Sequence, residues 1–198
     1  MSSALPWFIL ILPLGAAATI VLLTQSYRSL SASVSVAAVL GSFACSCIVF
    51  ARPDLHSIDF TWIDLRPLLF VPFGFILDHL SKTMLLLVSG IGALIHIYSL
   101  GYMRDEAGKS RYFASLSFFM LSMLGIVLEN NFVMMFIFWE LVGVSSYLLI
   151  GHWFERDAAA EAAKKAFLTN RIGDFGFMLG ILMAWTATGT VVFHEMAQ

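Results

Sequence analysis

Two acidic residues lie deep inside apolar stretches of this sequence, where charge is expensive. Glu140 is embedded in the apolar run 132–150. It lies about eight residues, or roughly 12 Å at 1.5 Å per helical residue, from the start of that run, which is close to the centre of a bilayer's hydrocarbon core. A carboxylate at this depth costs roughly 2.5 kcal/mol or more, so it requires a partner, a water path or a proton. Glu140 therefore predicts that charge is handled inside a membrane.

Asp174 is the second such acid, within the run 164–188. It lies about ten residues, or roughly 15 Å, from the start of that run. Because this run follows the run of Glu140 and should be antiparallel to it, the two carboxylates are expected at similar depths. Desolvation can keep such an acid protonated, and an approaching cation can release the proton. The two acids fit a proton relay; the alternative is that each only hydrogen-bonds a neighbouring helix.

Arg171 precedes Asp174 by three residues, so the two side chains should share one helix face. The arginine could pair with Asp174, or it could extend along its aliphatic stem toward the membrane surface. We favour a structural role for Arg171 over a role in transport.

Three more polar residues belong to the run that begins at residue 78. Asp78 suits the positive N-terminus of a helix, as a cap or a charge partner. Lys82 follows it by four residues, the favourable acid-before-base order, so an interfacial pair is expected. His96 lies deep in the same run, where it could shuttle protons or simply hydrogen-bond a backbone carbonyl. We keep both possibilities for His96 and favour the cap and pair for the other two residues.

The composition is that of an integral membrane protein. Of 198 residues 60% are hydrophobic and 12% are charged, and the mean hydropathy is +0.87, whereas soluble domains are about one quarter charged. No basic cluster indicates nucleic acid binding. Lipid leaves exposed backbone groups without partners, so each long apolar run should be helical. The runs are 4–24, 29–51, 78–101, 112–129, 132–153 and 164–188, which predicts an all-α membrane protein of about six transmembrane helices.

The charged residues between these runs predict the orientation. One set of connections carries seven basic residues: Arg28, Arg104, Lys109, Arg111, Arg156, Lys164 and Lys165. The opposite connections carry only Arg52 and Arg66, so the positive-inside rule places both termini on the outer face. Ser110 is then expected on the inner surface.

The connection 54–72 alternates polar and apolar residues, with Pro67 and Pro72 as expected breakers. This pattern predicts an extracytoplasmic β-hairpin or extended segment. At the other surface the stretch 157–165 is rich in alanine, glutamate and lysine, so it should extend the sixth helix inward.

Small residues around Glu140 favour close helix packing and leave room for water: Gly143, Ser145, Ser146 and Gly151. No phosphate loop or nucleophile triad is visible. Cys45 and Cys47 stand in an apolar helix without further ligands, so we expect neither a metal nor a bound cofactor.

Several motifs resemble the antiporter-like subunit L, or chain 5, of respiratory complex I (NADH:quinone oxidoreductase). They are residues 96–103 (HIYSLGYM), 139–151 (WELVGVSSYLLIG) and 164–174 (KKAFLTNRIGD), supported by 77–81 (LDHLS) and 193–196 (FHEM). The resemblance covers essentially the whole chain. The first subunit of multi-component sodium/proton antiporters shares much of this pattern.

The resemblance implies specific roles. In that family the glutamate of the WELVG motif, here Glu140, pairs with a lysine on a later helix, and the aspartate of NRIGD, here Asp174, is a second acid of the same proton half-channel. NADH, FMN, iron–sulfur clusters and quinone belong to other subunits, so this chain should bind no redox cofactor. Expected partners are the other membrane subunits and the lipid of a bacterial inner membrane. Residues 1–101 would form the first three helices with the hairpin, and residues 102–198 the start of the proton-translocating module.

The sequence departs from the family in length, because family members continue through many more helices, including the one with the lysine. Either a second polypeptide supplies these helices or the chain is a truncated product. Three functions remain open: part of a proton-translocating complex I subunit, the corresponding part of a cation/proton antiporter, or an inert fragment.

Overall fold

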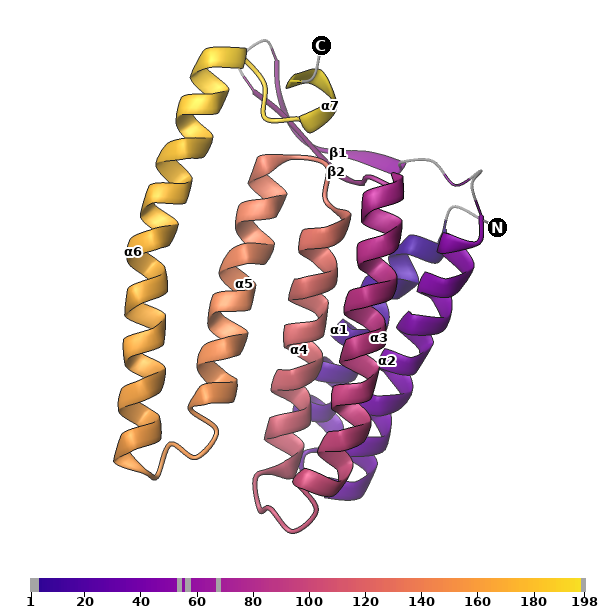
Figure 1. Ribbon diagram of the computed structural model, residues 1–198, viewed down its shortest axis with the longest axis vertical. Coiled ribbons are helices and arrows are strands. Elements are labelled where there is room, and N and C mark those ends of the chain that lie inside the picture. The colour runs from indigo at the N-terminus through magenta and orange to yellow at the C-terminus, as the bar shows by residue number, and fades with distance from the viewer. Residues whose placement is uncertain (1–3, 53–54, 56–57, 67–68, 197–198) are drawn as a thin grey trace.

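The computed structural model describes residues 4–52, 55, 58–66 and 69–196, and its long helices run alternately up and down in a bundle (Figure 1). Its helical elements are α1 (Leu5–Thr19), the π-helix η2 (Ile20–Thr24), α2 (Arg28–Phe50), α3 (His79–Tyr102), α4 (Lys109–Leu128), α5 (Phe132–Ile150), α6 (Asp157–Thr188) and α7 (Phe193–Met196).

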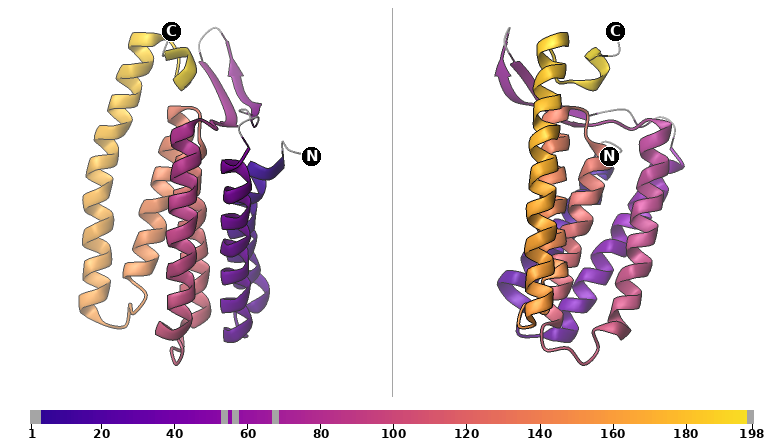
Figure 2. Two further views of the ribbon diagram at one scale, coloured as in Figure 1. Left: turned by 45° about the vertical axis from the view of Figure 1, so that its right-hand side comes forward. Right: turned by 60° about the vertical axis from the view of Figure 1, so that its left-hand side comes forward.

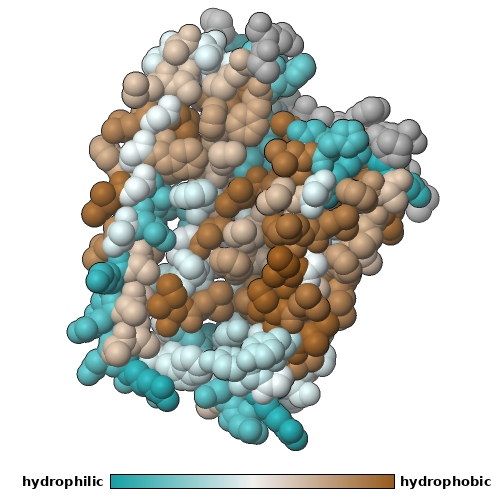
Figure 3. All heavy atoms as spheres, viewed as in Figure 1, coloured by the Kyte–Doolittle hydropathy of each residue, from teal (hydrophilic) through white to brown (hydrophobic). Residues whose placement is uncertain are grey.

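Five of these segments are long and apolar enough to cross a membrane within the described residues. They are α1 with η2, α2, α3, α4 and α5. Figure 3 shows brown and tan residues over much of the helical surface, with teal residues gathered mainly at the lower end. The prediction of an integral, multi-pass helical protein is therefore confirmed. The sixth expected span exists as a helix of 32 residues, α6, but it is less apolar, and its crossing of the membrane stays a prediction.

Helix α4 lies at the centre of the packing. It contacts α1, α2, α3 and α5, while α6 packs mainly against α5 at the edge of the bundle (Figure 2). Serines join the helices where they approach closely: the Ser35 hydroxyl of α2 lies 2.7 Å from that of Ser117 on α4, and Ser42 donates to the Ile9 carbonyl of α1 at 3.1 Å. Hydroxyl groups satisfied in this way allow close helix contact inside an apolar bundle.

The predicted hairpin is present and slightly shifted along the chain. Strand β1 (Ile58–Leu65) pairs antiparallel with β2 (Leu69–Phe75), with an irregularity between Thr61 and Ile63. The expectation that Pro72 breaks the strand is wrong, because it lies inside β2 opposite Thr61. Both strands of a two-stranded sheet are edges, so a missing N–H is tolerated there. Pro67 and Asp54 lie outside the described residues.

Aromatic contacts attach the hairpin to the helix bundle. The Trp7 ring of α1 lies 5.5, 5.3 and 4.5 Å from the rings of Phe60, Phe73 and Phe75. Asn131 accepts the Met134 N–H at the start of α5 and donates its own amide N–H to the Pro72 carbonyl at 2.7 Å. One side chain therefore caps α5 and fixes the hairpin over it.

The start of α3 confirms the predicted cap and corrects the predicted ion pair. Asp78 caps the helix by accepting the Ser81 N–H at 2.6 Å. Lys82 does not pair with Asp78: its buried Nζ donates to the Arg52 carbonyl at 2.9 Å. Asp78 has an extended backbone (φ −83°, ψ 178°), so helical i,i+4 spacing does not apply to it.

Helix α6 begins at Asp157, which confirms that residues 157–165 extend it. It ends at Thr188, and the next residue, Gly189, has a φ of +74° that turns the chain back toward α7. The start of α1, the hairpin and α7 all lie at the same end of the bundle (Figures 1 and 2).

Candidate functional site

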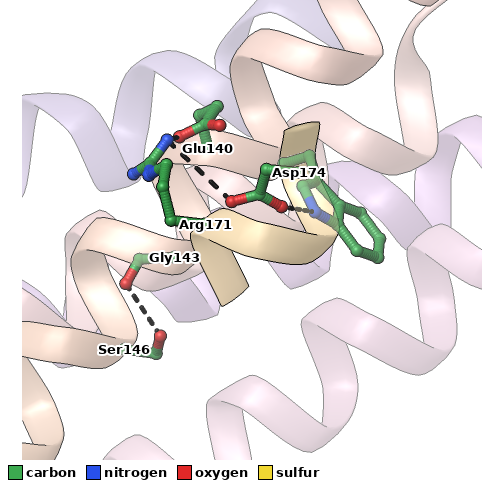
Figure 4. Close-up of polar contacts among 6 residues, drawn as sticks. Glu140, Gly143, Ser146, Arg171 and Asp174 are labelled. Atoms are coloured by element: carbon green, nitrogen blue, oxygen red, sulfur yellow. Dashed lines mark hydrogen bonds and ion pairs between the residues drawn. The ribbon is translucent and has the colours of Figure 1, made fainter. Parts of the chain in front are cut away.

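Glu140 of α5 and Asp174 of α6 flank one arginine, as Figure 4 shows. Arg171 Nη1 forms an ion pair with Glu140 Oε2, and Asp174 Oδ2 lies 3.9 Å from the same nitrogen. The two helices are antiparallel neighbours. This geometry agrees with the expectation that the two acids occupy similar depths.

Sequence reasoning missed the arginine as the cation of Glu140. The expected pairing of Arg171 with Asp174 is present as an ion pair of 3.9 Å. The hydrogen bond of Arg171, however, goes to Glu140 on the neighbouring helix. Arg171 lies one turn closer to the α5–α6 loop than Asp174 does, which brings it nearer to the depth of Glu140. Counting residues from the α5–α6 loop along both helices could have predicted this pairing.

The guanidinium of Arg171 lies over the face of an aromatic ring. It lies 4.7 Å from the centroid of the Phe167 ring, one helical turn earlier on α6. The side chain remains 43% exposed, against 20% for the Glu140 side chain. The cation is therefore positioned by a ring of its own helix and remains partly accessible.

Trp139 is a second residue whose role the sequence did not indicate. Its indole N–H donates to Asp174 Oδ1 at 2.8 Å, across from α5 to α6. Asp174 itself is only 5% exposed. One carboxylate oxygen thus accepts from a neutral donor while the other faces Arg171, which fixes the orientation of the acid.

Two hollows reach the cluster. One of about 440 Å³ lies beside Asp174 and includes Trp139, Gly143, Thr169 and Asn170 in its lining. The other, about 370 Å³, is lined by Glu140, Arg171, Asp174, Phe136, Phe175 and Met178. A Cβ added at Gly143 would meet nothing within 4 Å, so it would extend into free space. Because glycine has no side chain, the first hollow stays open at this point.

The other small residues near Glu140 form hydrogen bonds within α5 or allow close packing against α6. The Ser145 and Ser146 hydroxyls donate to carbonyls of their own helix at 3.1 and 2.9 Å. A Cβ on Gly151 would lie 3.3 Å from Ala163 Cβ of α6. Gly151 therefore serves close approach of the two helices, as expected of a packing residue.

His96 lies outside the acid cluster. Fully buried on α3, it hydrogen-bonds through Nδ1 to the Gly92 carbonyl at 2.7 Å, and its Nε2 has no partner among the described residues. The backbone hydrogen bond foreseen as one alternative is therefore present. Asp78 caps α3, and Lys82 and His96 belong to it. No hydrogen bond or ion pair in the described part of the chain joins these three residues to Glu140 or Asp174.

The charges of the cluster do not balance. Two carboxylates surround one guanidinium, so the three groups carry a net charge of minus one unless one acid is protonated. An uncompensated charge in a low-dielectric region is costly. One further positive charge would balance the cluster.

Glu129, which directly follows α4, is a buried acid that was not among the residues expected to matter. It is 5% exposed, and neither carboxylate oxygen has a hydrogen-bond partner in the described structure. Burial raises the pKa of this carboxyl to about 9, so it is protonated at neutral pH. Its backbone forms an isolated bridge with Phe75 of the hairpin.

A metal centre is not formed by the described side chains, because no group of three or more His, Cys, Asp or Glu residues among them could hold an ion.

Comparison with known families supports the sequence resemblance. The family described as "NADH-Ubiquinone oxidoreductase (complex I), chain 5 N-terminus" matches residues 62–113. The family described as "NADH:quinone oxidoreductase/Mrp antiporter, TM" matches residues 129–198. The two matches leave residues 114–128 of α4 between them and together include most of the hairpin, α3 and the acid cluster.

Individual relatives are named as the same subunit that the family models describe. The chain is 44% identical over 178 residues to the chloroplast NAD(P)H-quinone oxidoreductase subunit 5 of Zygnema circumcarinatum, covering 88% of this chain and 25% of that protein. It is 38% identical over 195 residues to NADH-quinone oxidoreductase subunit L of Mycobacterium tuberculosis, covering 94% of this chain and 31% of the relative. The chain thus spans about a quarter to a third of the length of these two relatives.

Solved structures share the fold. A chain of the Mrp complex from Dietzia sp. superposes with a TM-score of 0.80 at 26% identity, covering 96% of this chain and 20% of that one. A chain of an archaeal membrane-bound sulfane sulfur reductase superposes with a TM-score of 0.82 at 21% identity, covering 98% and 40%. These proteins are parts of membrane complexes. The chain belongs to the family of antiporter-like membrane subunits of NADH:quinone oxidoreductase and Mrp antiporters, and corresponds to the N-terminal part of the member called subunit L or chain 5.

Proposed function

We propose that the chain is the N-terminal part of a membrane-arm subunit of a proton-translocating NADH:quinone oxidoreductase, and that Glu140 and Asp174 belong to its proton half-channel. The observation that carries the proposal is the net charge of the cluster, in which two acids share Arg171. A site that lacks one positive charge can be filled alternately by a proton and by another cation. Such an alternation would allow the approach of a cation to be coupled to the release of a proton.

Each residue of the cluster has a distinct task in this scheme. Asp174, oriented by the Trp139 indole, exchanges a proton with water in the adjoining hollow, where Thr169 and Asn170 supply polar lining. Glu140 keeps Arg171 in place when Asp174 is protonated. The two carboxylates need one positive charge besides that of Arg171. A cation that approaches Glu140 supplies this charge, so the proton is released. In relatives a lysine of a later helix would be that cation.

The surface of α6 supports the idea that this part works within a larger assembly. Ile172 is 78% exposed and Met183 is 71% exposed on the helix that carries Arg171 and Asp174. Further helices of the subunit, or a separate chain, would cover this face and bring the lysine. Residues 102–198 would then be the start of the translocating module, and residues 1–101 its N-terminal extension.

The remaining parts of the proposed activity belong to other subunits. The names of the relatives indicate NAD(P)H and quinone as substrates of their complexes. NADH, FMN, iron–sulfur clusters and quinone would be bound by other chains, with this one acting only on protons. We propose the inner membrane of a bacterium as the location.

The test is proton pumping by the assembled complex with Glu140→Gln. Gln keeps the size of the side chain and removes its charge, so the cluster becomes neutral without a bound proton. We expect NADH-driven pumping in proteoliposomes to fall about tenfold, with the subunits still assembled as judged by purification. Asp174→Asn should have the same effect.

Glu155→Gln is the matched control, since Glu155 is an exposed acid in the α5–α6 loop. It should pump at the wild-type rate. Wild-type pumping by Glu140→Gln in an intact complex would reject the relay.

A second function, part of an Mrp-type cation/proton antiporter, is favoured by the superposition on the Mrp chain. The complex purified with this chain distinguishes the two. Quinone reduction by NADH supports the first proposal, and sodium-driven proton movement without NADH oxidation supports the second.

A further inference from the structure

An apolar groove lies at the opposite end of the bundle from the hairpin, between α1 with η2 and the first half of α4. Its volume is about 510 Å³, within the range of small-ligand sites. The lining is almost wholly apolar along its length and includes Leu14, Ala17, Val21, Ala114 and Phe118. Such a groove fits a hydrocarbon chain lying along the helices.

Polar groups gather at one end of the groove. Gln25 follows η2, and Ser110 and Arg111 belong to the first turn of α4. The Ser110 hydroxyl is buried without a hydrogen-bond partner among the described residues. The groove is apolar along its length and polar at one end. A phospholipid has the same arrangement, with an apolar acyl chain and a polar headgroup.

Arg111 is positioned to receive an anion. One guanidinium N–H donates to the His152 carbonyl at 2.8 Å, and the group lies 4.7 Å from the centroid of the Phe154 ring. These two contacts fix its plane. No other hydrogen bond from the guanidinium is made within the described structure, so N–H donors remain for a phosphate.

A second cation adjoins the first. A smaller hollow of about 250 Å³ shares Arg111, Ser115 and Leu148 with the groove, and Lys164 of α6 lies in its lining. Neither lining contains an acidic residue. The site therefore favours a headgroup with net negative charge over a zwitterionic one.

The helix itself is distorted at the groove. The π-helix η2 occupies Ile20–Thr24, at the point where α1 approaches the polar end. Single π turns are rare and are often found at functional sites. This turn places Ile20, Val21 and Leu22 in the lining.

We propose that the groove binds an anionic phospholipid, with one acyl chain between α1 and α4 and the phosphate between Arg111 and Lys164. Four basic residues of the surrounding loops and helix ends lie at this end of the bundle as well: Arg28, Arg104, Lys109 and Arg156. By the positive-inside rule the lipid belongs to the inner leaflet.

The experiment uses the intact complex reconstituted into vesicles of equal phosphatidylglycerol and phosphatidylcholine, extracted again in mild detergent. Native mass spectrometry then counts the lipids retained on this chain. The wild type should keep one phosphatidylglycerol. Ala18→Phe fills the groove from an exposed position of α1 and should reduce retention about tenfold.

Ala37→Phe is the control, because Ala37 is an exposed alanine of α2 away from the groove; it should retain the lipid. Arg111→Gln and, separately, Lys164→Gln should lose the preference for phosphatidylglycerol, while Arg111→Lys should keep it. The proposal is overturned if Ala18→Phe retains lipid as the wild type does, if the preference survives both Gln variants, or if the wild type retains none because another polypeptide occupies the groove.

Discussion

At the level of single residues, the cluster of Glu140, Arg171 and Asp174 shows why a charged residue in a membrane helix needs its neighbours to be interpreted. Each acid alone would require a proton or a cation. Arg171 satisfies part of this requirement for both. What remains is a single missing positive charge, on which the proposed proton exchange rests.

Glu129 illustrates the opposite case, an acid with no partner in the described structure. Its carboxyl has an ordinary pKa of 4.5, which burial raises to about 9. Between these values the folded protein holds a proton that the unfolded chain releases. Stability should therefore fall as the pH rises through this window.

Glu129→Gln tests this linkage. Gln resembles the neutral acid, so the variant should match the wild type near pH 5 and be more stable near pH 8. The measurement is the midpoint of thermal unfolding in detergent at several pH values. Glu155→Gln, which changes an exposed acid, should keep the wild-type slope. Equal slopes for Glu129→Gln and the wild type would contradict the burial of this carboxyl as a neutral group.

At the level of elements, α5 connects the central helix α4 to the peripheral helix α6. Its contact with α4 depends on Gly125, where an added Cβ would overlap the ring of Phe138. Phe138 belongs to the main apolar core. The rotation of α5, and with it the direction of Glu140 and Trp139, is thus fixed by a ring seated against a glycine.

Gly125→Ala should therefore destabilise the bundle by about 1–3 kcal/mol, the usual cost of overpacking. The change is measured as the free energy of unfolding in detergent. Gly15→Ala in α1 is the control, since a Cβ there meets nothing within 4 Å and alanine favours helix by roughly 0.5–1 kcal/mol. A Gly125→Ala variant as stable as Gly15→Ala would show that α4 and α5 are not closely packed at this point.

At the level of the whole molecule, the alternation of helices places the hairpin and the basic loops at opposite ends of the bundle. The positive-inside rule assigns the basic end to the cytoplasmic side. Ser110, expected on that surface, is in fact buried in the first turn of α4, so it is unsuited to a labelling test. Ala107 in the preceding loop is exposed.

Cysteine labelling tests this orientation in a variant with Cys45 and Cys47 replaced by alanine. Ala107→Cys should react with an impermeant maleimide only from the inner side. Thr61→Cys, in the exposed part of the hairpin, should react only from the outer side. The reverse pattern would invert the orientation, and labelling of both from one side would contradict the alternation of helices.

The sequence by itself determined the membrane class, the helical runs, the hairpin and the presence of two costly acids. These features follow from local rules: lipid demands internal backbone hydrogen bonds, alternation marks a strand, and a charge in an apolar run stands out by composition. The extension of α6 from Asp157 was predictable for the same reason, since helix propensity is local. So was the Asp78 cap, which depends on the next three residues.

Only the tertiary structure decided which polar groups meet. Arg171 binds Glu140, Trp139 donates to Asp174, Lys82 donates to the Arg52 carbonyl, and Glu129 has no partner in the described structure. Helical periodicity assigns side chains to one face of one helix, but it leaves open how that helix is rotated and how deep it lies against the next. Those two quantities are set by packing, such as the ring of Phe138 against Gly125, and they select the partner of every buried charge.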